Sequence, residues 1–196
     1  MKPEVFSSHS DGDSLAAKAA ADLSERILQL RQQQDLVHIV LTGGSVGIKT
    51  LEKLAVHLAQ EDLTNLHLWW GDERFVEPDS PDRNLVQADA ALLSKVSVPP
   101  QNIHQMPSNT DGDIDEAAEH FAAHLEDVAP QFDIVLLGMG PDGHVASLFP
   151  GSSATEVGQL VVVEKNSPKP PANRISLSYE ALNSSKDVWF LVSGSD

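Results

Sequence analysis

The chain has 196 residues, 41% of them hydrophobic, which is enough to build the core of one domain, with or without a small appendage. Its 13 basic and 29 acidic residues give a formal net charge of −16, which argues against binding to nucleic acid or to an anionic membrane surface. The absence of cysteine excludes disulfides, thiolate catalysis and cysteine-ligated metals. If the ligand is anionic, the few basic side chains must be concentrated where it binds.

Signals for membrane insertion and secretion are also missing. No apolar run reaches the roughly 18 residues that a transmembrane helix needs. The N-terminus shows no basic stretch followed by an apolar one, as a signal peptide would. We therefore expect a cytoplasmic protein.

The N-terminal pattern predicts a short strand at Val5 and Phe6, followed by a helix over residues 14–32. Apolar residues recur at helical spacing through this range, and Asp11 or Asp13 stands where an N-cap is needed. Polar residues behind the apolar stripe are typical of an outer helix packed on a sheet.

The next predicted strand, residues 36–41, runs into a glycine-rich turn and then a helix over residues 46–60. The turn contains Gly43, Gly44 and Ser45. Glycines leave backbone amides open and a helix N-terminus adds partial positive charge, so this arrangement suits a phosphate. It is not a Walker loop, because the Gly-Lys-Ser/Thr ending is absent. The alternative is a plain turn in which Ser45 caps the helix.

A third predicted strand, residues 66–70, is followed by three charged residues, Asp72, Glu73 and Arg74. Three charges at the carboxyl end of a strand are unusual for a structural turn. An arginine among acids can hold a phosphate or a carboxylate through two hydrogen bonds. The alternative is a surface ion pair.

The middle of the chain alternates loops and helices. We expect the proline-punctuated loop 78–83 to be mobile and near the site, and Asn84 to open a helix that ends near residue 93. Residues 103–106 are predicted to form a short strand, and residues 111–129 an amphipathic helix.

Two histidines on that second helix, His120 and His124, are four residues apart, a spacing that can bind a metal. No third ligand is evident in the sequence. We therefore interpret both as solvated helix residues and expect no metal site.

The stretch 132–151 most clearly carries chemistry. Residues 133–137 are almost wholly apolar, as in a strand buried on both faces of a parallel sheet. A glycine-rich loop then leads to Asp142 and His144, at the strand end where ligands bind in open α/β sheets. A histidine there can accept or donate a proton near neutral pH, and Asp142 can orient or neutralise it.

The same loop matches the Gly-x-Gly-x-x-Gly fingerprint of dinucleotide-binding folds through Gly138, Gly140 and Gly143. The fingerprint needs a long helix after the third glycine, whereas Pro150 and Gly151 stop any helix within about two turns. We therefore expect no nicotinamide cofactor. The remaining alternative is a structural turn with a surface histidine.

The last third holds the most basic segment of this acidic chain. After a strand over residues 160–164, Lys169 and Arg174 flank prolines that hold the backbone extended. These two side chains are candidates to converge on a phosphate. Strands over residues 175–177 and 187–192, with a short helix between them, complete the pattern.

Strands alternate with helices along the chain, without internal repeats, linkers or low-complexity tracts. This predicts a single α/β domain over residues 1–196. We expect a three-layer αβα architecture, with a Rossmann-like, mostly parallel sheet flanked by helices on both faces.

Four segments, in this order, resemble a known family. The set strongly resembles the 6-phosphogluconolactonases, and its Gly-Met-Gly-x-Asp-Gly-His block is shared with the related glucosamine-6-phosphate deaminases/isomerases. Arg74 stands where deaminases usually carry an aromatic residue, and the Lys-Pro-Pro and Ser-Leu-Phe-Pro-Gly stretches also favour the lactonases. The four segments are Gly43-Gly44-Ser45, residues 71–76, residues 138–151 and residues 169–175.

The resemblance implies hydrolysis of 6-phospho-D-glucono-1,5-lactone to 6-phosphogluconate in the oxidative pentose phosphate pathway, without metal or cofactor. His144 would be the general base on water. Asp142 would set the tautomer of His144, and Arg74 would stabilise the oxyanion or hold the product carboxylate. Asp72 and Asn84 would contact sugar hydroxyls or orient other groups. The 6-phosphate would be bound by the backbone amides of Gly43, Gly44 and Ser45 together with the side chains of Lys169 and Arg174.

Other interpretations stay open. The family normally continues through a further helix or two after the position of Asp196, so we expect that C-terminal part to be absent. A serine nucleophile is disfavoured, because there is no Gly-x-Ser-x-Gly elbow and Ser147 has only His144 near it as a base. The alternatives are an amino-sugar-phosphate isomerase or deaminase and a non-catalytic sugar-phosphate-binding protein. We expect a monomer or a weak homodimer.

Overall fold

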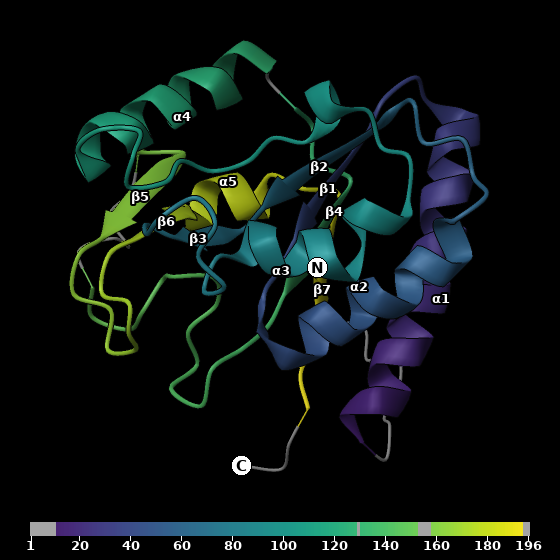
Figure 1. Cartoon of the computed structure of the whole chain (residues 1–196), viewed down its shortest axis with the longest axis horizontal. Coiled ribbons are helices and arrows are strands. Elements are labelled where there is room, and N and C mark those ends of the chain that lie inside the picture. Colours follow the sequence, from purple (N-terminus) through teal and green to yellow (C-terminus); the bar gives the residue numbers. More distant parts are fainter. Residues whose placement is uncertain (1–10, 129, 153–157, 194–196) are drawn as a thin grey trace.

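The computed structural model describes residues 11–128, 130–152 and 158–193 (Figure 1). The strand predicted at Val5 and Phe6 lies outside these ranges. No helix within them is long and apolar enough to cross a membrane.

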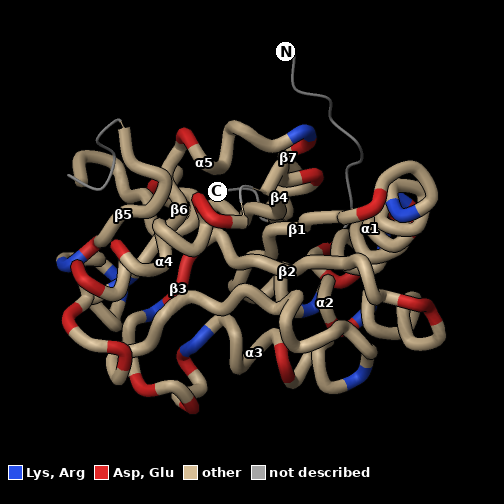
Figure 2. Tube along the Cα trace, turned by 90° about the horizontal axis from the view of Figure 1, so that it is seen from above, with Lys and Arg blue, Asp and Glu red and all other residues tan. Residues whose placement is uncertain are grey.

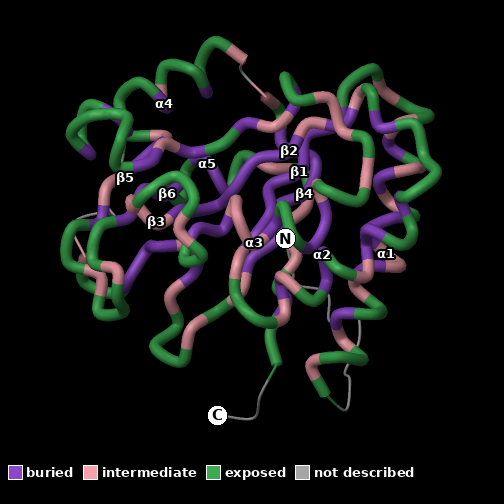
Figure 3. The backbone as a smooth tube through the Cα atoms, in the orientation of Figure 1, coloured by how far each residue is buried: buried purple, intermediate pink, exposed green. Residues whose placement is uncertain are grey.

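A parallel sheet lies at the centre of the fold. Within the described ranges it has four strands in the order β2-β1-β4-β7, and every neighbouring pair is parallel. Figure 3 shows its buried strands between more exposed helices and loops. Because both faces are covered, these strands are nearly continuous apolar runs, as the sequence indicated. The strands are β1 (Val37–Leu41), β2 (Leu66–Trp70), β4 (Ile134–Leu137) and β7 (Asp187–Phe190).

Helices cover both faces of this sheet, which confirms the predicted mostly parallel α/β architecture. On one face, α1 (Gly12–Gln33), α2 (Gly44–Leu58) and α3 (Asn84–Ala91) share a core with alternate strand residues. On the other face, α4 (Ile114–Val128) and α5 (Tyr179–Asn183) enclose a second core.

A second sheet extends from the carboxyl end of β2. In the part of the chain that the structure describes, it has three antiparallel strands in the order β3-β6-β5: β3 (Asp72–Arg74), β6 (Arg174–Leu177) and β5 (Val161–Glu164). Gly71 joins the two sheets, because its N–H donates to Leu41 and its carbonyl accepts from Leu177. The charged triplet Asp72–Arg74 therefore forms a strand, and the backbone of Arg74 pairs with that of Arg174 across the second sheet.

The predicted strand over residues 103–106 is wrong. Ile103 forms only an isolated bridge to Leu68. The carbonyl of Met106 instead accepts a hydrogen bond of 2.6 Å from the guanidinium of Arg83. This carbonyl is therefore bonded to a buried side chain rather than to a neighbouring strand.

The first residues of α1 and α2 decide between the N-cap alternatives that the sequence left open. Asp11 caps α1, since its side chain accepts from the N–H groups of Asp13 and Ser14. The N-cap of α2 is Gly43, without a side-chain hydrogen bond, so the interpretation of Ser45 as N-cap is wrong. The first turn of α2 therefore keeps its amides available for a ligand.

Candidate active site

A cavity of about 290 Å³ lies at the carboxyl ends of β1, β2 and β4. Of the ten predicted site residues, eight line it, Asp142 contacts one of the lining residues, and Ser45 does not line it. Parallel strands bring segments that are distant in sequence to a common edge, which is why these residues meet. The lining residues among the predictions are Gly43, Gly44, Asp72, Arg74, Asn84, His144, Lys169 and Arg174.

The His144 ring is held by Asp142 and by a close approach to the backbone. Nδ1–H of His144 donates to the Asp142 carboxylate, and this hydrogen bond is the main cause that lowers the pKa of Asp142. The other ring nitrogen, Nε2, is then the proton acceptor of the neutral ring. A Cβ at Gly140 would lie 2.1 Å from a ring carbon of His144, so this position leaves no room for a side chain.

The glycine turn before α2 approaches Asn84 just as closely. A Cβ at Gly43 would lie 2.0 Å from the side-chain oxygen of Asn84. Gly44 has a φ of +78°, in the region that favours glycine. The turn is thus shaped by both glycines, while the side chain of Ser45 is exposed.

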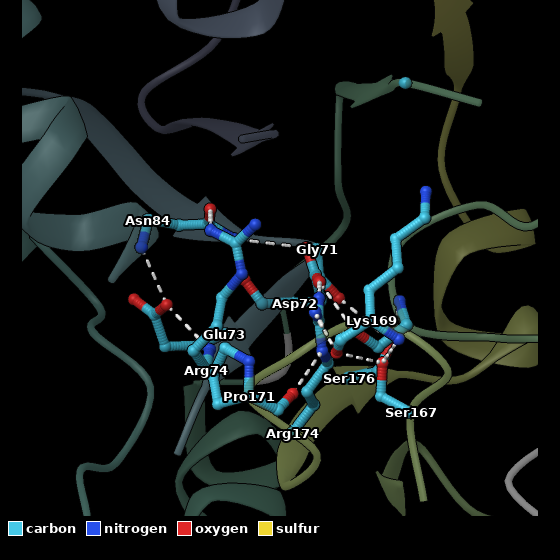
Figure 4. A network of polar contacts seen from close by, with 12 residues as sticks. Gly71, Asp72, Glu73, Arg74, Asn84, Ser167, Lys169, Pro171, Arg174 and Ser176 are labelled. Carbon is cyan, nitrogen blue, oxygen red and sulfur yellow. Dashed lines mark hydrogen bonds and ion pairs between the residues drawn. The ribbon is translucent and has the colours of Figure 1, made fainter. Parts of the chain in front are cut away.

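Arg74 and Asn84 connect the charged strand to α3 (Figure 4). Arg74 Nη1 donates to the carbonyl of Asp82 at 2.9 Å and to the side-chain oxygen of Asn84. The amide nitrogen of Asn84 donates to the backbone and side-chain oxygens of Asp72, at 2.8 and 3.2 Å. Arg74 has no carboxylate within ion-pair distance among the described residues, so its charge is available to an anion in the cavity.

Arg174 and Lys169 have different geometries. Arg174 is 5% exposed and donates to the carbonyls of Pro171 and Lys169, at 3.2 and 3.0 Å. Its Nη1 lies 3.9 Å from the Asp72 carboxylate. Lys169 is exposed, and its ammonium group points away from this network (Figure 4). Arg174 therefore supports the loop that presents Lys169, in addition to lining the cavity.

A family model described as glucosamine-6-phosphate isomerases/6-phosphogluconolactonase matches residues 10–196. The 6-phosphogluconolactonase of Mycobacterium leprae is 40% identical, over 97% of this chain and 80% of that protein. The corresponding values for the 6-phosphogluconolactonase of Streptomyces coelicolor are 39%, 96% and 77%. This chain belongs to the glucosamine-6-phosphate isomerase/6-phosphogluconolactonase family. The crystal structure of a 6-phosphogluconolactonase from Thermotoga maritima matches with a TM-score of 0.82 and 31% identity, over 90% of this chain and 78% of that one.

The sequence interpretation missed the role of Glu73, a buried carboxylate in this family member. Glu73 is 1% exposed and accepts from the backbone N–H groups of Arg74, Asn84 and Leu85, at 2.8, 2.7 and 2.9 Å. Arg83 Nε lies 3.5 Å from it. Burial raises the pKa of Glu73, and the N–H donors and Arg83 oppose that rise. Glu73 thus fixes both the start of α3 and the backbone of Arg74.

The predicted loop 78–83 ends at Arg83, the residue that pairs with Glu73. Arg83 is 3% exposed and also donates to the Met106 carbonyl. Its pairing with Glu73 anchors the end of the loop beside the cavity. A glutamate and an arginine ten residues apart around a proline-rich loop carry no sequence signal that they pair.

The charge of the cavity differs from that of the whole molecule. Figure 2 shows acidic residues spread along many outer segments, with fewer basic ones. Among the described lining residues, however, are three cations, Arg74, Lys169 and Arg174, and one carboxylate, Asp72. A chain with 29 acids and 13 bases thus concentrates positive charge at this edge, as an anionic substrate requires.

The described residues contain no group of three or more His, Cys, Asp or Glu side chains arranged to hold a metal ion. His124, expected to be a solvated residue, is exposed, but its Nε2 lies 3.0 Å from Nδ1 of His104. It therefore belongs to a hydrogen-bonded cluster that the sequence did not reveal.

Proposed function

We propose that this family member hydrolyses 6-phospho-D-glucono-1,5-lactone to 6-phosphogluconate, with His144 as the general base that activates water. Relatives that carry the name of this activity are about 40% identical over most of the chain. The observation that supports the role of His144 is its fixed ring. Nδ1–H is committed to Asp142, so Nε2 is left as a proton acceptor in a ring that lines the cationic cavity.

In the proposed reaction, the substrate phosphate is held by the first-turn amides of α2 and by the ammonium of Lys169. His144 removes a proton from water, whose oxygen attacks C1 of the lactone. Negative charge develops on the C1 oxygen, and the guanidinium of Arg74, which has no carboxylate partner among the described residues, stabilises it. The bond between C1 and the ring oxygen then breaks, and the departing oxygen takes the proton from His144.

Water as the nucleophile is favoured over serine by the surroundings of Ser147. Ser147 is 0% exposed and does not line the cavity. Its Oγ–H donates to the Asp72 carboxylate at 2.6 Å rather than to His144. A serine in this position lacks both access to C1 and a histidine base.

The test is lactone hydrolysis, with substrate generated in situ by glucose-6-phosphate dehydrogenase and its loss compared with the spontaneous rate. Replacement of His144 by alanine is expected to lower kcat by roughly 10²- to 10⁴-fold, because a general base contributes about that much. His120→Ala, which removes an exposed histidine on α4, is the matched control.

Turnover near the wild-type rate in His144→Ala would exclude the general-base role. If the wild-type chain itself does not accelerate hydrolysis, the lactonase proposal fails. Ammonia release from glucosamine 6-phosphate would then favour the isomerase or deaminase activity of the family.

A further inference from the structure

Ser147 lies beneath the cavity and joins two segments of the site. Its hydroxyl donates to Oδ2 of Asp72 at 2.6 Å, and its backbone N–H donates to Oγ of Ser176 at 3.3 Å. The residue is fully buried. A buried hydroxyl with one short hydrogen bond to a carboxylate restricts where that carboxylate can point.

Asp72 has other partners, but they are longer or shared. The side-chain amide of Asn84 donates to Oδ1 of Asp72 at 3.2 Å and also to the Asp72 backbone carbonyl, and its oxygen accepts from Arg74. Arg174 lies 3.9 Å from Oδ2 and is engaged by backbone carbonyls of its own loop. Ser147 therefore makes the shortest of these side-chain contacts to Asp72, the carboxylate that lines the cavity.

The same serine sits in a strained turn just after His144. The N–H of Leu148 donates to the carbonyl of Val145 at 3.0 Å, which closes a turn over residues 145–148. Ala146 in this turn has a φ of +50°, a region that glycine favours, and it is the one non-glycine residue with positive φ among the described ranges. Such a conformation persists only where its surroundings hold it, and such strain clusters at functional sites.

We propose that Ser147 is a positioning residue that clamps the Asp72 carboxylate to the turn following His144. The clamp keeps the general base and the carboxylate, which both line the cavity, in fixed positions, although His144 follows β4 of the parallel sheet and Asp72 lies in β3 of the second sheet. It holds the strained backbone at Ala146, and it acts on the reaction through Asp72. The catalytic part of this proposal rests on the proposed hydrolysis.

A double-mutant cycle between Ser147→Ala and Asp72→Ala tests the clamp. Ser147→Ala alone is expected to lower kcat/KM by about 10- to 100-fold, the range for loss of a hydrogen bond to a buried charge. In the Asp72→Ala background the same change is expected to cost less than about threefold, because the partner is already gone. The near-isosteric Asp72→Asn, which weakens the charge-assisted bond, serves as the second background if Asp72→Ala does not fold.

Ser178→Ala is the matched control, since Ser178 is a buried serine whose hydroxyl accepts from Ala181 N–H at the start of α5. It removes a buried hydroxyl without touching Asp72 and is expected to act equally in both backgrounds. Wild-type kcat/KM in Ser147→Ala, or equal losses from Ser147→Ala in the presence and absence of the Asp72 carboxylate, would overturn the positioning role.

Amide hydrogen exchange tests the clamp without turnover. Exchange at Leu148 N–H is expected to rise about tenfold in Ser147→Ala and in Asp72→Ala, but not in Ser178→Ala, because the turn loses its restraint. If the wild type shows no hydrolysis but exchange rises as stated, the proposed function fails and the clamp stands. Unchanged exchange in Ser147→Ala would overturn the clamp whatever the activity.

Discussion

The two ends of the parallel sheet bury polar side chains in different ways. Beyond the carboxyl ends of the strands the buried groups are charged: Asp72, Glu73, Arg83 and Arg174 are each less than a tenth exposed. Ion pairs and N–H donors compensate them, and Arg74 remains without a carboxylate partner among the described residues. This end of the sheet is equipped to bind an anion.

Nearer the amino ends of β1 and β2, the buried polar groups include one paired carboxylate, Asp133 with Lys186 at 2.8 Å, and a set of imidazole rings. His67 Nδ1 lies 2.9 Å from His104 Nε2, and His104 Nδ1 lies 3.0 Å from His124 Nε2. His104 also stacks on Trp69, with ring centroids 3.7 Å apart, and His38 accepts from the Trp69 indole. Burial is the main cause that lowers the pKa of His38 and of His104 to about 4.

Buried charge in this fold lies where other groups compensate it. Charge is expensive to bury and is found where backbone amides, counter-ions and a charged substrate can offset it. Under α4, hydrogen-bonded and stacked imidazole rings fill the space against Trp69, and burial keeps His38 and His104 neutral near pH 7.

The largest effect is expected from Glu73→Gln. The change leaves Arg83 buried without a carboxylate and weakens the acceptors for three N–H groups, so the free energy of unfolding should fall by about 3–5 kcal/mol. Urea denaturation measures it. Glu77→Gln, on the exposed loop next to β3, is the control and should stay within about 0.5 kcal/mol of wild type. A loss below about 1 kcal/mol at Glu73 would mean that the charged end is not held by this pair.

The next prediction concerns kcat and depends on geometry rather than on charge. Gly140→Ala places a methyl group where the His144 ring and Asp142 Oδ1 now lie, so the ring must move. A displacement of about 1 Å can cost about 100-fold in kcat, while the melting temperature should change little. In the comparison variant Gly138→Ala, the nearest atom to the new Cβ is 4.0 Å away, and a much smaller loss of kcat is expected. Equal losses in both variants would show that the close approach at Gly140 does not position the base.

The elements and most of the cavity could be predicted from the sequence because the relevant signals are local. Apolar runs located β1, β2 and β4, and the polar residues just after each strand had to meet at one edge. The antiparallel sheet could not be separated from the main one. Its strands are short, and the pairing of Asp72 with Ser176 joins positions far apart in the chain.

The side-chain contacts inside the site also could not be predicted from local sequence patterns. Arg174 was predicted to hold phosphate, yet most of its hydrogen bonds support the Lys169 loop. Glu73, Arg83 and Ser147 act through partners on other elements, and no spacing in the sequence indicates those pairings. Burial of a charged residue becomes predictable only when the group that compensates it is known.

A further effect is expected at the histidines under α4 and is absent at neutral pH. Because burial lowers the pKa of His104 from 6.5 to about 4, the unfolded chain binds one more proton than the folded chain between those values. The stability that comes from keeping this ring neutral is therefore complete above pH 6.5 and is lost as the pH falls toward 4. His104→Phe keeps a ring against Trp69 but removes this titration, so the slope of unfolding free energy against pH should fall by about 1.4 kcal/mol per pH unit in that window.

Urea denaturation of both proteins from pH 4 to 8 measures the slopes. Above pH 7 the two curves should run parallel, which controls for the stability lost with the His67 and His124 hydrogen bonds. Equal slopes below pH 6.5 would mean that His104 takes up its proton as readily in the folded chain as in the unfolded one, so that burial does not keep this ring neutral.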